Sequence, residues 1–470
     1  MNVLLLNPFD PAKAPVSPWP HLGLTLMASR ARDLGHQAFV VDYAFSPQAP
    51  RIEELIRSRS PDVVGLTLYT AHMGRARALI RELRRLTAAP VVVGGPHATL
   101  YAEELAAEAL ADAVFRGECD LAFAREMPNL RTGKAGRIVA ADPPDLAEIP
   151  DPDFSLAYGA AAMTYYPLQL SRGCPFGCSF CSVRRISSRR VRYRDPGRCL
   201  DEIEATRPRF PKLRFFRIVD DCPTFDLPRF KDFLREYLRR GIGLPLHIDN
   251  LRADRFDDEM LDLIRRIGVD HLCIGVESGN PKVFAAIDKG ESLEAIARAA
   301  RMIKRHGIRL YACFIVGLPE STAAAERDSI RLARALKPAW IYWNLFQPHK
   351  GTEARAWFER HGRIFGEEDK SSLIDLGLGN TDAPCDTEEF PAAERRRMQV
   401  AASLATGAYW LNPLFFPRYV SIIRKNKLGR EFRSGFPAAL RINLGMLGHR
   451  IARSFRRRFP GPGRRRAGRK

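Results

Sequence analysis

The stretch Gly173-Cys174-Pro175-Phe176-Gly177-Cys178-Ser179-Phe180-Cys181 places three cysteines on one short loop in the spacing Cys-x3-Cys-x2-Cys. Three thiolates cannot pair off as disulfides without leaving one over, but they can hold three irons of a cubane cluster and leave the fourth iron open. A structural zinc site would need a fourth cysteine or histidine close by. The next cysteine is Cys199, and no histidine lies between His97 and His247. Cys174, Cys178 and Cys181 are therefore predicted to bind a 4Fe–4S cluster.

The composition is that of a large globular protein with reduced cysteines. The chain has 470 residues, 46% of them hydrophobic, which suits about two to four domains of ~100–200 residues each. Outside the loop the cysteines are isolated, often within apolar runs, as expected of buried thiols in a reducing compartment. No apolar run reaches the ~18 uncharged residues of a membrane span, and the N-terminus lacks the basic region of a signal peptide. We therefore expect a cytoplasmic protein.

The cysteine loop resembles the signature of the radical S-adenosylmethionine (SAM) enzymes, including the aromatic Phe180 before the last cysteine. In that family the open iron is chelated by the amino and carboxylate groups of SAM. The resemblance therefore implies SAM as a second cofactor, an electron donor such as flavodoxin or ferredoxin, and Phe180 as part of the cofactor site.

Residues 1–130 alternate short apolar runs with amphipathic segments. Single helices between the strands indicate an α/β fold with a parallel, doubly wound sheet, in which ligands bind at the carboxyl ends of the strands. Glycines in the loops after the strands permit a close backbone approach to a bulky cofactor. The expected strands are Val3–Leu6, Ala38–Asp42, Val63–Leu68, Pro90–Gly94 and Ala113–Arg116, and the expected helices are Leu22–Leu34, Ile52–Ser58, Ala76–Leu86 and Ala102–Ala109.

The order of these loops resembles the Rossmann-like cobalamin-binding domain that precedes many radical SAM modules. The matching pieces are Pro20-His21-Leu22-Gly23-Leu24, Pro61-Asp62-Val63-Val64-Gly65-Leu66-Thr67, Val93-Gly94-Gly95-Pro96-His97-Ala98 and Arg116-Gly117-Glu118. The resemblance implies that cobalamin is a cofactor and that it contacts Gly23, Gly65, Thr67, Gly94, Gly95, Gly117 and Glu118. The alternative is a domain that binds a nucleotide or has only a structural role. A dinucleotide site would show Gly-x-Gly-x-x-Gly after the first strand, where this chain has Asn7-Pro8-Phe9-Asp10.

The chain departs from some cobalamin domains in one respect. Those domains carry Asp-x-His-x-x-Gly, whose histidine ligates cobalt from below, and this motif is absent here. His21, His72 and His97 lie near the relevant loops but lack those neighbours. Cobalt is therefore expected to have no histidine ligand on its lower face.

The second half of the chain repeats the alternation. Residues 131–165, rich in proline and acid, are expected to form a linker. From 166 to 375, six strand–helix units resemble the partial (β/α)6 TIM-type barrel of radical SAM enzymes, whose chemistry lies at the carboxyl ends of the strands. The expected strands are Tyr166–Ser171, Leu213–Val219, Leu244–Ile248, His271–Val276, Ile308–Val316 and Trp340–Phe346.

Two of these strand ends carry candidate SAM contacts. Glu277 and Ser278 match a position that often contacts the ribose or the methionine of SAM. The segment Cys313-Phe314-Ile315-Val316-Gly317 resembles the family's Gly-x-Ile-x-Gly pattern, with a cysteine in place of the first glycine. That resemblance implies that Ile315 and Gly317 support the adenine.

Acidic residues close two other strands, at Asp220, Asp221 and Asp249. They are either functional groups or caps and solvated turn acids before the following helices.

The chain ends in a basic region, 376–470, in which we expect helices. From Asn412 to Lys470 there are 17 Lys or Arg and one acid, a local net charge of +16, so the other 411 residues carry only about +4 of the total +20. Aromatic and aliphatic residues among these arginines suit a helix in an anionic membrane interface, which would make the protein peripheral on the inner face of the membrane. A solvated, partly disordered end is the main alternative, and nucleic acid is the partner that we favour least.

Together, the resemblances over residues 1–375 imply a cobalamin-dependent radical SAM enzyme. Such enzymes are most commonly methyltransferases that move a methyl group from methylcobalamin to an unactivated carbon. The substrate is expected to be a small molecule or a lipid, with hopanoids as one concrete case. Two alternatives stay open: a cyclase or rearrangement enzyme that uses cobalamin, and a non-catalytic cobalamin or iron–sulfur sensor.

Overall fold

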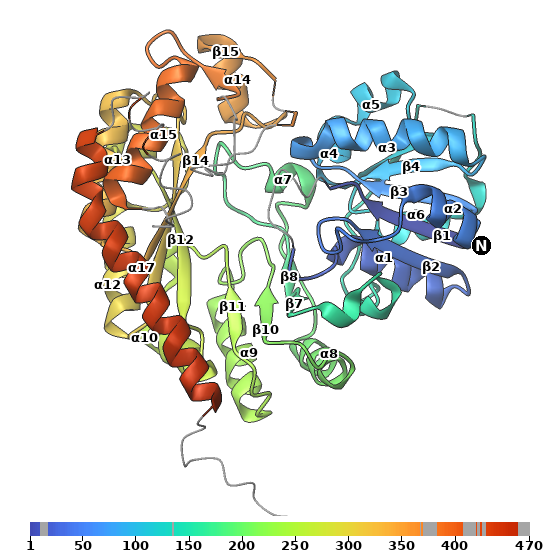
Figure 1. Cartoon of the computed structure of the whole chain (residues 1–470), viewed down its shortest axis with the longest axis horizontal. Coiled ribbons are helices and arrows are strands. Elements are labelled where there is room, and N and C mark those ends of the chain that lie inside the picture. Colours follow the sequence, from blue (N-terminus) through green and yellow to red (C-terminus); the bar gives the residue numbers. More distant parts are fainter. Residues whose placement is uncertain are drawn as a thin grey trace, which may run out of the picture.

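The computed structural model describes residues 1–9, 17–133, 136–366, 368–369, 383–407, 420, 424 and 429–458, with side chains of the last helix up to Leu444. Two α/β units lie side by side in Figure 1, the N-terminal one in blue on the right and a curved sheet in green to orange on the left. No helix among the described residues is long and apolar enough to cross a membrane.

The N-terminal unit contains a parallel sheet in the order β2-β1-β3-β4-β5-β6. Strand order reverses between β1 and β3, and ligands of open α/β sheets bind at the carboxyl side of such a reversal. The strands are β1 (Asn2–Asn7), β2 (Gln37–Asp42), β3 (Val63–Thr67), β4 (Val91–Gly94), β5 (Ala113–Gly117) and β6 (Arg137–Ala141).

Helices cover both faces of this sheet, because successive residues of a buried strand point to opposite sides. Val3 and Leu5 belong to the core under one layer of helices, whereas Leu4 and Leu6 belong to the core under the other. The first layer is α1 (Leu22–Asp33) and α6 (Asp120–Glu126), and the second is α2 (Ile52–Arg59), α3 (Met73–Leu86), α4 (Gly95–Leu100) and α5 (Ala102–Glu108). The expected doubly wound fold is confirmed.

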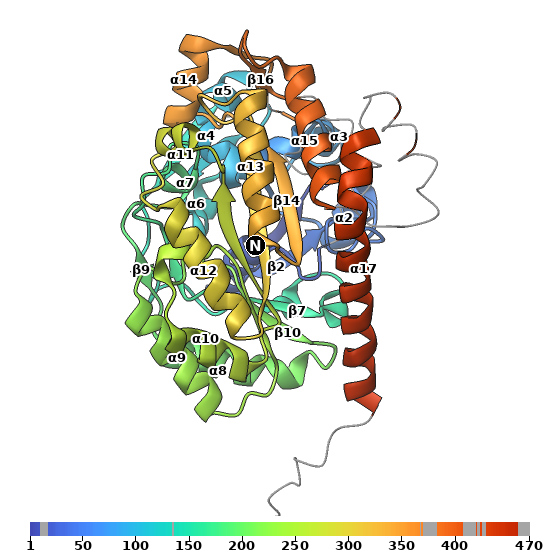
Figure 2. The ribbon, with the colours of Figure 1, turned by 90° about the vertical axis from the view of Figure 1, so that its left-hand side faces the viewer.

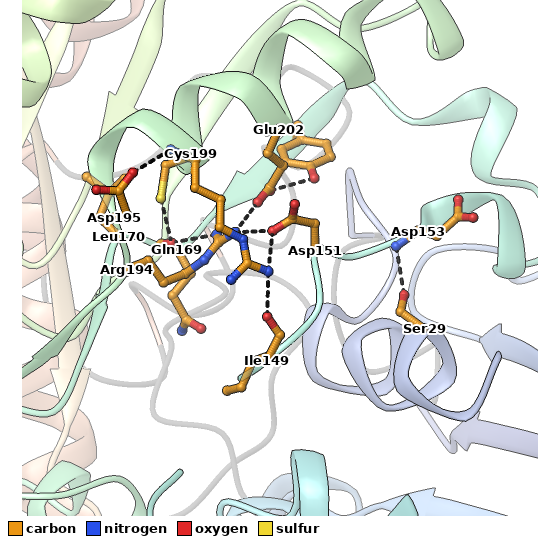
Figure 3. Close-up of polar contacts among 12 residues, drawn as sticks. Ser29, Ile149, Asp151, Asp153, Gln169, Leu170, Arg194, Asp195, Cys199 and Glu202 are labelled. Atoms are coloured by element: carbon orange, nitrogen blue, oxygen red, sulfur yellow. Dashed lines mark hydrogen bonds and ion pairs between the residues drawn. The ribbon is translucent and has the colours of Figure 1, made fainter. Parts of the chain in front are cut away.

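The segment expected to be a linker, 131–165, is in part a piece of the sheet. Its strand β6 pairs in parallel with β5 at the edge of the N-terminal unit. Further along, Asp153 N–H donates to Ser29 Oγ of α1 at 2.8 Å, and Asp151 accepts a hydrogen bond from Arg194 Nη2 at 2.6 Å (Figure 3). Arg194 also pairs with the buried Glu202. The acidic residues of this segment therefore tie the two units together.

The second unit has six parallel strands that follow one another in chain order, as predicted for a partial barrel. They form two sheets, and a bridge between Leu251 and Ile274 connects them. The strands are β7 (Tyr165–Leu168), β10 (Phe215–Ile218) and β11 (Leu246–Ile248), then β12 (His271–Glu277), β13 (Arg309–Val316) and β14 (Trp340–Leu345). The helices are α8 (Pro196–Arg209), α9 (Leu227–Arg239), α10 (Asp258–Ile267), α11 (Pro281–Ala286), α12 (Leu293–Arg305), α13 (Ala323–Leu336) and α14 (Glu353–His361).

The C-terminal region is not a separate tail where it begins. After the short pair β15 (Arg363–Ile364) and β16 (Cys385–Asp386), helix α15 (Ala392–Thr406) packs against β14 and α13. The helix α17 (Gly429–Arg458) then lies along α15 (Figure 2). A Cβ on Gly435 would lie 1.6 Å from Leu404 O, so the two helices approach closely because a glycine stands at the contact.

Part of the predicted membrane-binding surface lies outside the described residues, namely Tyr409, Trp410, Phe415, Phe416, Tyr419, Ile422 and Ile423.

Candidate functional site

The cysteine loop connects two short antiparallel strands, β8 (Ser171–Arg172) and β9 (Arg192–Tyr193). Two aspartates anchor its first residues. Asp220, which follows β10, is 1% exposed and accepts hydrogen bonds from Leu170 N–H at 2.8 Å and from the Ser171 hydroxyl at 2.5 Å. Asp221 accepts one from Gly173 N–H at 2.9 Å. Burial raises the pKa of Asp220 to about 7. Asp220 and Asp221 are thus neither helix caps nor solvated turn acids, because their hydrogen bonds anchor the loop that carries the thiols.

The backbone of the loop needs a glycine at its first position. Gly173 has φ +97°, in the left-handed region, and a Cβ there would lie 2.5 Å from Arg190 O. The loop then contains one short helix, α7 (Val183–Ile186), before β9.

The thiols of Cys174, Cys178 and Cys181 are half-buried and close enough to affect one another. Burial raises the pKa of Cys178 to about 12 and that of Cys181 to about 11, and a neighbouring thiol of the loop raises each further. Buried thiols of this kind are poor free thiolates, whereas iron stabilises the thiolate form. This set of soft donors therefore fits an iron–sulfur cluster.

The structure adds a fourth sulfur, which is isolated in the sequence. Cys222 follows Asp221, is 2% exposed, and hydrogen-bonds through its thiol to Cys174. That hydrogen bond lowers the pKa of Cys174 to about 7. No local spacing motif relates Cys222 to the loop, so only the tertiary structure brings these sulfurs together.

A buried group of charges lies near Cys178. Lys289 Nζ is 3.2 Å from Glu277 Oε1 and 3.1 Å from Glu291 Oε2. Burial raises the pKa of Cys178, and the positive charge of Lys289 opposes that effect. Glu277, a predicted SAM contact, is thus ion-paired within the protein at the end of β12.

The other predicted SAM contact on β12 is also engaged. Ser278 is 3% exposed; its Oγ lies 3.4 Å from Ser329 Oγ and accepts a hydrogen bond from Asn280 N–H at 3.2 Å. These contacts join the end of β12 to α13.

At the end of β13, two buried side chains fix the backbone of Gly317. Its N–H donates to Glu326 Oε1 at 2.9 Å, and its carbonyl accepts from Arg395 Nη1 at 2.7 Å. Ile315 and Phe180 are partly buried against the barrel core. The predicted adenine support therefore has a rigid backbone, held in part by α15.

A cavity lies between the two units and brings the predicted cobalamin contacts together. Its empty volume is about 1140 Å³, counting the part open to solvent, and its lining is mostly apolar. The barrel side of the lining includes Gln169, Arg172, Ile186, Ser187 and Asp221, which flank or belong to the cysteine loop. The N-terminal side includes every predicted contact: Gly23, Gly65, Thr67, Gly94, Gly95, Gly117 and Glu118. The flat, apolar faces of a corrin ring fit such a lining.

Glu118 has a second role that the sequence did not reveal. Its carboxylate is ion-paired with Arg172 at 3.0 Å and with Arg192, both from the strands that flank the cysteine loop. Arg172 also binds Asp120 through two hydrogen bonds, at 2.7 and 3.0 Å. This buried network holds the cysteine loop against the N-terminal unit.

Of the three histidines considered as cobalt ligands, only His21 is among the residues that line the cavity. Its Nε2 lies 2.8 Å from Tyr69 Oη, and its Nδ1 accepts a hydrogen bond from Leu24 N–H at 3.1 Å. His97 is 1% exposed and bonds to Thr70 Oγ1 at 2.9 Å, and burial lowers its pKa to about 4.

The inside of the barrel has a wall of rings. The His247 ring meets the Tyr165 ring edge-on at a centroid distance of 5.3 Å and the His271 ring at 4.9 Å. His271 stacks on Tyr311 at 4.3 Å. On β14, Tyr342 keeps 37% of its surface exposed. Tyr165 and His271 are the first residues of β7 and β12, so these rings pack at the amino ends of the barrel strands, away from the ends where chemistry occurs in such barrels.

Near this wall, His247, Asp270 and His271 offer ligand atoms that all lie within 4.8 Å of one another. The Asp270 carboxylate, however, already lies 2.5 Å from His271 Nδ1 and 3.0 Å from Arg309 Nη2. The carboxylate is thus already ion-paired with Arg309 and in contact with the His271 ring, which disfavours a bound metal ion there.

Comparisons with known proteins agree with this architecture. Two family models match the chain, the B12 binding domain over residues 13–125 and the radical SAM superfamily over residues 168–333. One relative is the anaerobic magnesium-protoporphyrin IX monomethyl ester cyclase of Rubrivivax gelatinosus, 28% identical over 382 residues, or 74% of this chain and 68% of that protein. Another is the bacteriochlorophyllide d C-12(1)-methyltransferase of Chlorobaculum tepidum, 25% identical over 298 residues, or 62% of this chain and 64% of that protein.

Solved structures share the fold. The radical SAM methyltransferase TsrM of Kitasatospora setae, with tryptophan and a SAM analogue bound, matches with a TM-score of 0.61 at 20% identity, covering 75% of this chain and 74% of that one. The cobalamin-dependent radical SAM enzyme OxsB, with aqua-cobalamin and SAM bound, matches with a TM-score of 0.63 at 14% identity, covering 92% of this chain and 71% of that one.

The predicted family, cofactors and enzymatic nature are thus confirmed, and the sensor alternative is wrong. The chain belongs to the cobalamin-binding radical SAM family, and it is an enzyme whose cofactors are a 4Fe–4S cluster, SAM and cobalamin.

Proposed function

We propose that this enzyme is a methyltransferase that moves a methyl group from methylcobalamin to an unactivated carbon of an apolar substrate. One observation carries the proposal. The cavity at the strand ends of the N-terminal unit is lined on its other side by Ile186 and Ser187 of the cysteine loop and by Asp221, which anchors that loop. Groups bound in the cavity and on the loop would therefore be neighbours, as transfer between them requires.

Each cofactor has a proposed set of residues. Cys174, Cys178 and Cys181 would hold the cluster, and the strand ends that carry Gly65 and Gly94 would hold cobalamin. The ends of β12 and β13 would hold SAM, with the backbone of Gly317 kept in place by Glu326 and Arg395. When bound, the cluster and SAM supply a 5′-deoxyadenosyl radical that removes a hydrogen atom from the substrate, and cobalamin supplies the methyl group.

The protein's own contribution is to position these groups and to exclude water. Arg172, Glu118 and Asp120 clamp the cysteine loop to the cavity wall. The substrate would bind at the carboxyl ends of the barrel strands, beside the cavity, whose mostly apolar lining suits an apolar molecule. A lipid of this class, such as a hopanoid, remains our specific proposal.

A lipid substrate would be reached most easily from a membrane surface, and α17 has the features of a peripheral contact. Phe436, Leu440 and Leu444 recur at a spacing of four residues and are 40%, 43% and 57% exposed. Arg433 and Arg441 lie on the same exposed part of the helix. Basic residues near an anionic surface contribute ~1 kcal/mol each, so a few engaged side chains beside this apolar stripe would give reversible attachment.

The test measures 5′-deoxyadenosine, which would form when SAM is cleaved, and S-adenosylhomocysteine, which would form when a second SAM restores the methyl group of cobalamin. Anaerobically reconstituted enzyme, with flavodoxin or ferredoxin as reductant, is incubated with SAM, methylcobalamin and either lipid or polar fractions of cell extract. Formation of both 5′-deoxyadenosine and S-adenosylhomocysteine with the lipid fraction supports lipid methylation. The variant Cys178→Ala is the control and should form neither product. Both products with the polar fraction alone would refute the lipid part of the proposal.

A second candidate function is oxidative cyclisation. It is favoured by relatives named as magnesium-protoporphyrin IX monomethyl ester cyclases in Rubrivivax gelatinosus and in Synechocystis, the latter 27% identical over 389 residues. In that case 5′-deoxyadenosine would form without S-adenosylhomocysteine, and the same assay distinguishes the two reactions.

A further inference from the structure

Two side chains on the N-terminal wall of the cavity form a pair that the proposed function does not yet use. Tyr69 lies two residues beyond the end of β3, and His21 immediately precedes α1, which follows β1. Both line the cavity, and His21 Nε2 lies 2.8 Å from Tyr69 Oη. They thus stand on the two strand-end loops that flank the reversal of strand order, where ligands of such sheets bind.

The hydrogen bonds decide which nitrogen of His21 carries its proton. Leu24 N–H can only donate, so His21 Nδ1, at 3.1 Å, is the acceptor and carries no proton. The proton of the neutral ring is therefore on Nε2, which donates to Tyr69 Oη. Burial lowers the pKa of His21 to about 4, so the ring is neutral at neutral pH. Both nitrogens are used within the protein, and His21 has no lone pair to offer a metal.

Tyr69 is held by this bond but still faces open space. Its side chain keeps 38% of its surface accessible while lining the cavity. The surrounding protein raises the pKa of Tyr69, and the charge of Asp42 adds to this, so the hydroxyl stays protonated at neutral pH. Among the residues that the structure describes, His21 is the polar partner of Tyr69 Oη. The cavity wall therefore presents a neutral phenol in a fixed position.

We infer that Tyr69, held by His21, is the residue that faces the lower side of cobalt and keeps protein nitrogen away from it. The inference rests on the binding of cobalamin in this cavity, as proposed above. The methyl group must face the barrel, where the cysteine loop and the proposed substrate site lie, so the opposite side of the corrin faces the strand ends that carry Tyr69. A neutral phenol is a weak donor to cobalt compared with imidazole, so Tyr69 is a positioning residue that leaves this side without a strong ligand.

The experiment uses the reconstituted holoenzyme in its Co(II) state and electron paramagnetic resonance. The wild-type spectrum should show no nitrogen superhyperfine splitting, with or without added imidazole. In Tyr69→Ala, space opens beneath cobalt, so added imidazole should bind and produce nitrogen splitting that changes when nitrogen-15 imidazole is used. The matched control is Met27→Ala, which opens space elsewhere on the cavity wall and should give no splitting. A second variant, Tyr69→His, should show the splitting without any addition.

Each outcome bears on the inference separately from the proposed function. Bound cobalamin is measured first by its absorption, and a wild-type protein that retains none contradicts the proposed site itself. With cobalamin bound, nitrogen splitting in the wild type would overturn the inference about Tyr69. Splitting of equal intensity in Met27→Ala would also overturn it, and so would the absence of splitting from both Tyr69 variants.

Discussion

Arg172 and Glu118 join the two halves of the enzyme: Arg172 Nη1 lies 3.0 Å from Glu118 Oε2. Arg172 immediately precedes the first glycine of the cysteine loop, and Glu118 follows the last residue of β5. Both side chains are largely buried, at 10% and 8% exposure. The residue that precedes the cysteine loop is thus fixed directly to the wall of the cavity proposed for cobalamin.

Removing this arginine should destabilise the enzyme. Arg172→Met leaves the carboxylates of Glu118 and Asp120 with less compensation in a buried position, and breaking a buried pair typically costs about 3–5 kcal/mol. Chemical denaturation should show a loss of that order. The matched control is Arg116→Gln, whose pair with Glu103 is exposed, and exposed pairs contribute roughly 0–1 kcal/mol. Equal losses in the two variants would contradict a structural role for the buried network.

Lys289 should set the reduction potential of the cluster. Its buried ammonium acts on Cys178, so Lys289→Met removes a positive charge beside a cluster that gains an electron. Reduction potentials respond to such local charge, and we expect a shift to more negative values by roughly 60 mV or more, about tenfold in the equilibrium for one electron. Potentiometric titration monitored by electron paramagnetic resonance measures it. Lys282→Met, which removes an ammonium that is 76% exposed, is the control and should leave the potential unchanged.

Glu326 should make stability depend on pH. Burial raises its pKa from 4.5 to about 7, so between these values the folded enzyme binds more protons than the unfolded chain. Stability contributed by this group is therefore present at low pH and lost as pH rises toward about 7. Glu326→Gln should remove this loss. The melting temperature of the variant minus that of the wild type should therefore be larger at pH 8 than at pH 5. The exposed variant Glu359→Gln should show no such difference; if it does, Glu326 is not the source.

The apolar stripe of α17 should determine attachment to anionic vesicles. The combined variant Phe436→Ser, Leu440→Ser and Leu444→Ser leaves the buried Ile442 and Gly435 in place, so α17 should remain packed on α15. Co-sedimentation with anionic vesicles should fall strongly in the variant, and neutral vesicles should bind neither protein. Salt at ~1 M should weaken wild-type binding, because the Debye length shortens to about 3 Å. Equal recovery of both proteins with anionic vesicles would contradict the membrane proposal.

Local patterns of the sequence were sufficient to predict most of the strands and the cysteine loop. The run Val3–Leu6 became β1 (Asn2–Asn7), and the run Trp340–Phe346 became β14 (Trp340–Leu345), because strand periodicity and burial are visible in neighbouring residues. The spacing of the three cysteines likewise needs only adjacent residues. By contrast, β6 lay within a segment whose prolines and acids favoured a linker, and only its pairing with β5 makes it a strand.

The amino-acid sequence by itself determined the two α/β units, the thiol loop and the glycine-bearing strand ends, since these follow from short-range patterns. Only the tertiary structure decided which charged and polar residues meet. Three such pairs are Arg172 with Glu118, Lys289 with Glu277, and His21 with Tyr69. Nothing in the neighbouring sequence distinguishes any of these residues from a solvated side chain. Folding removes them from water, and a buried polar group must then find a partner. The packing of whole strands and helices therefore determines these partners, and no local sequence pattern predicts them.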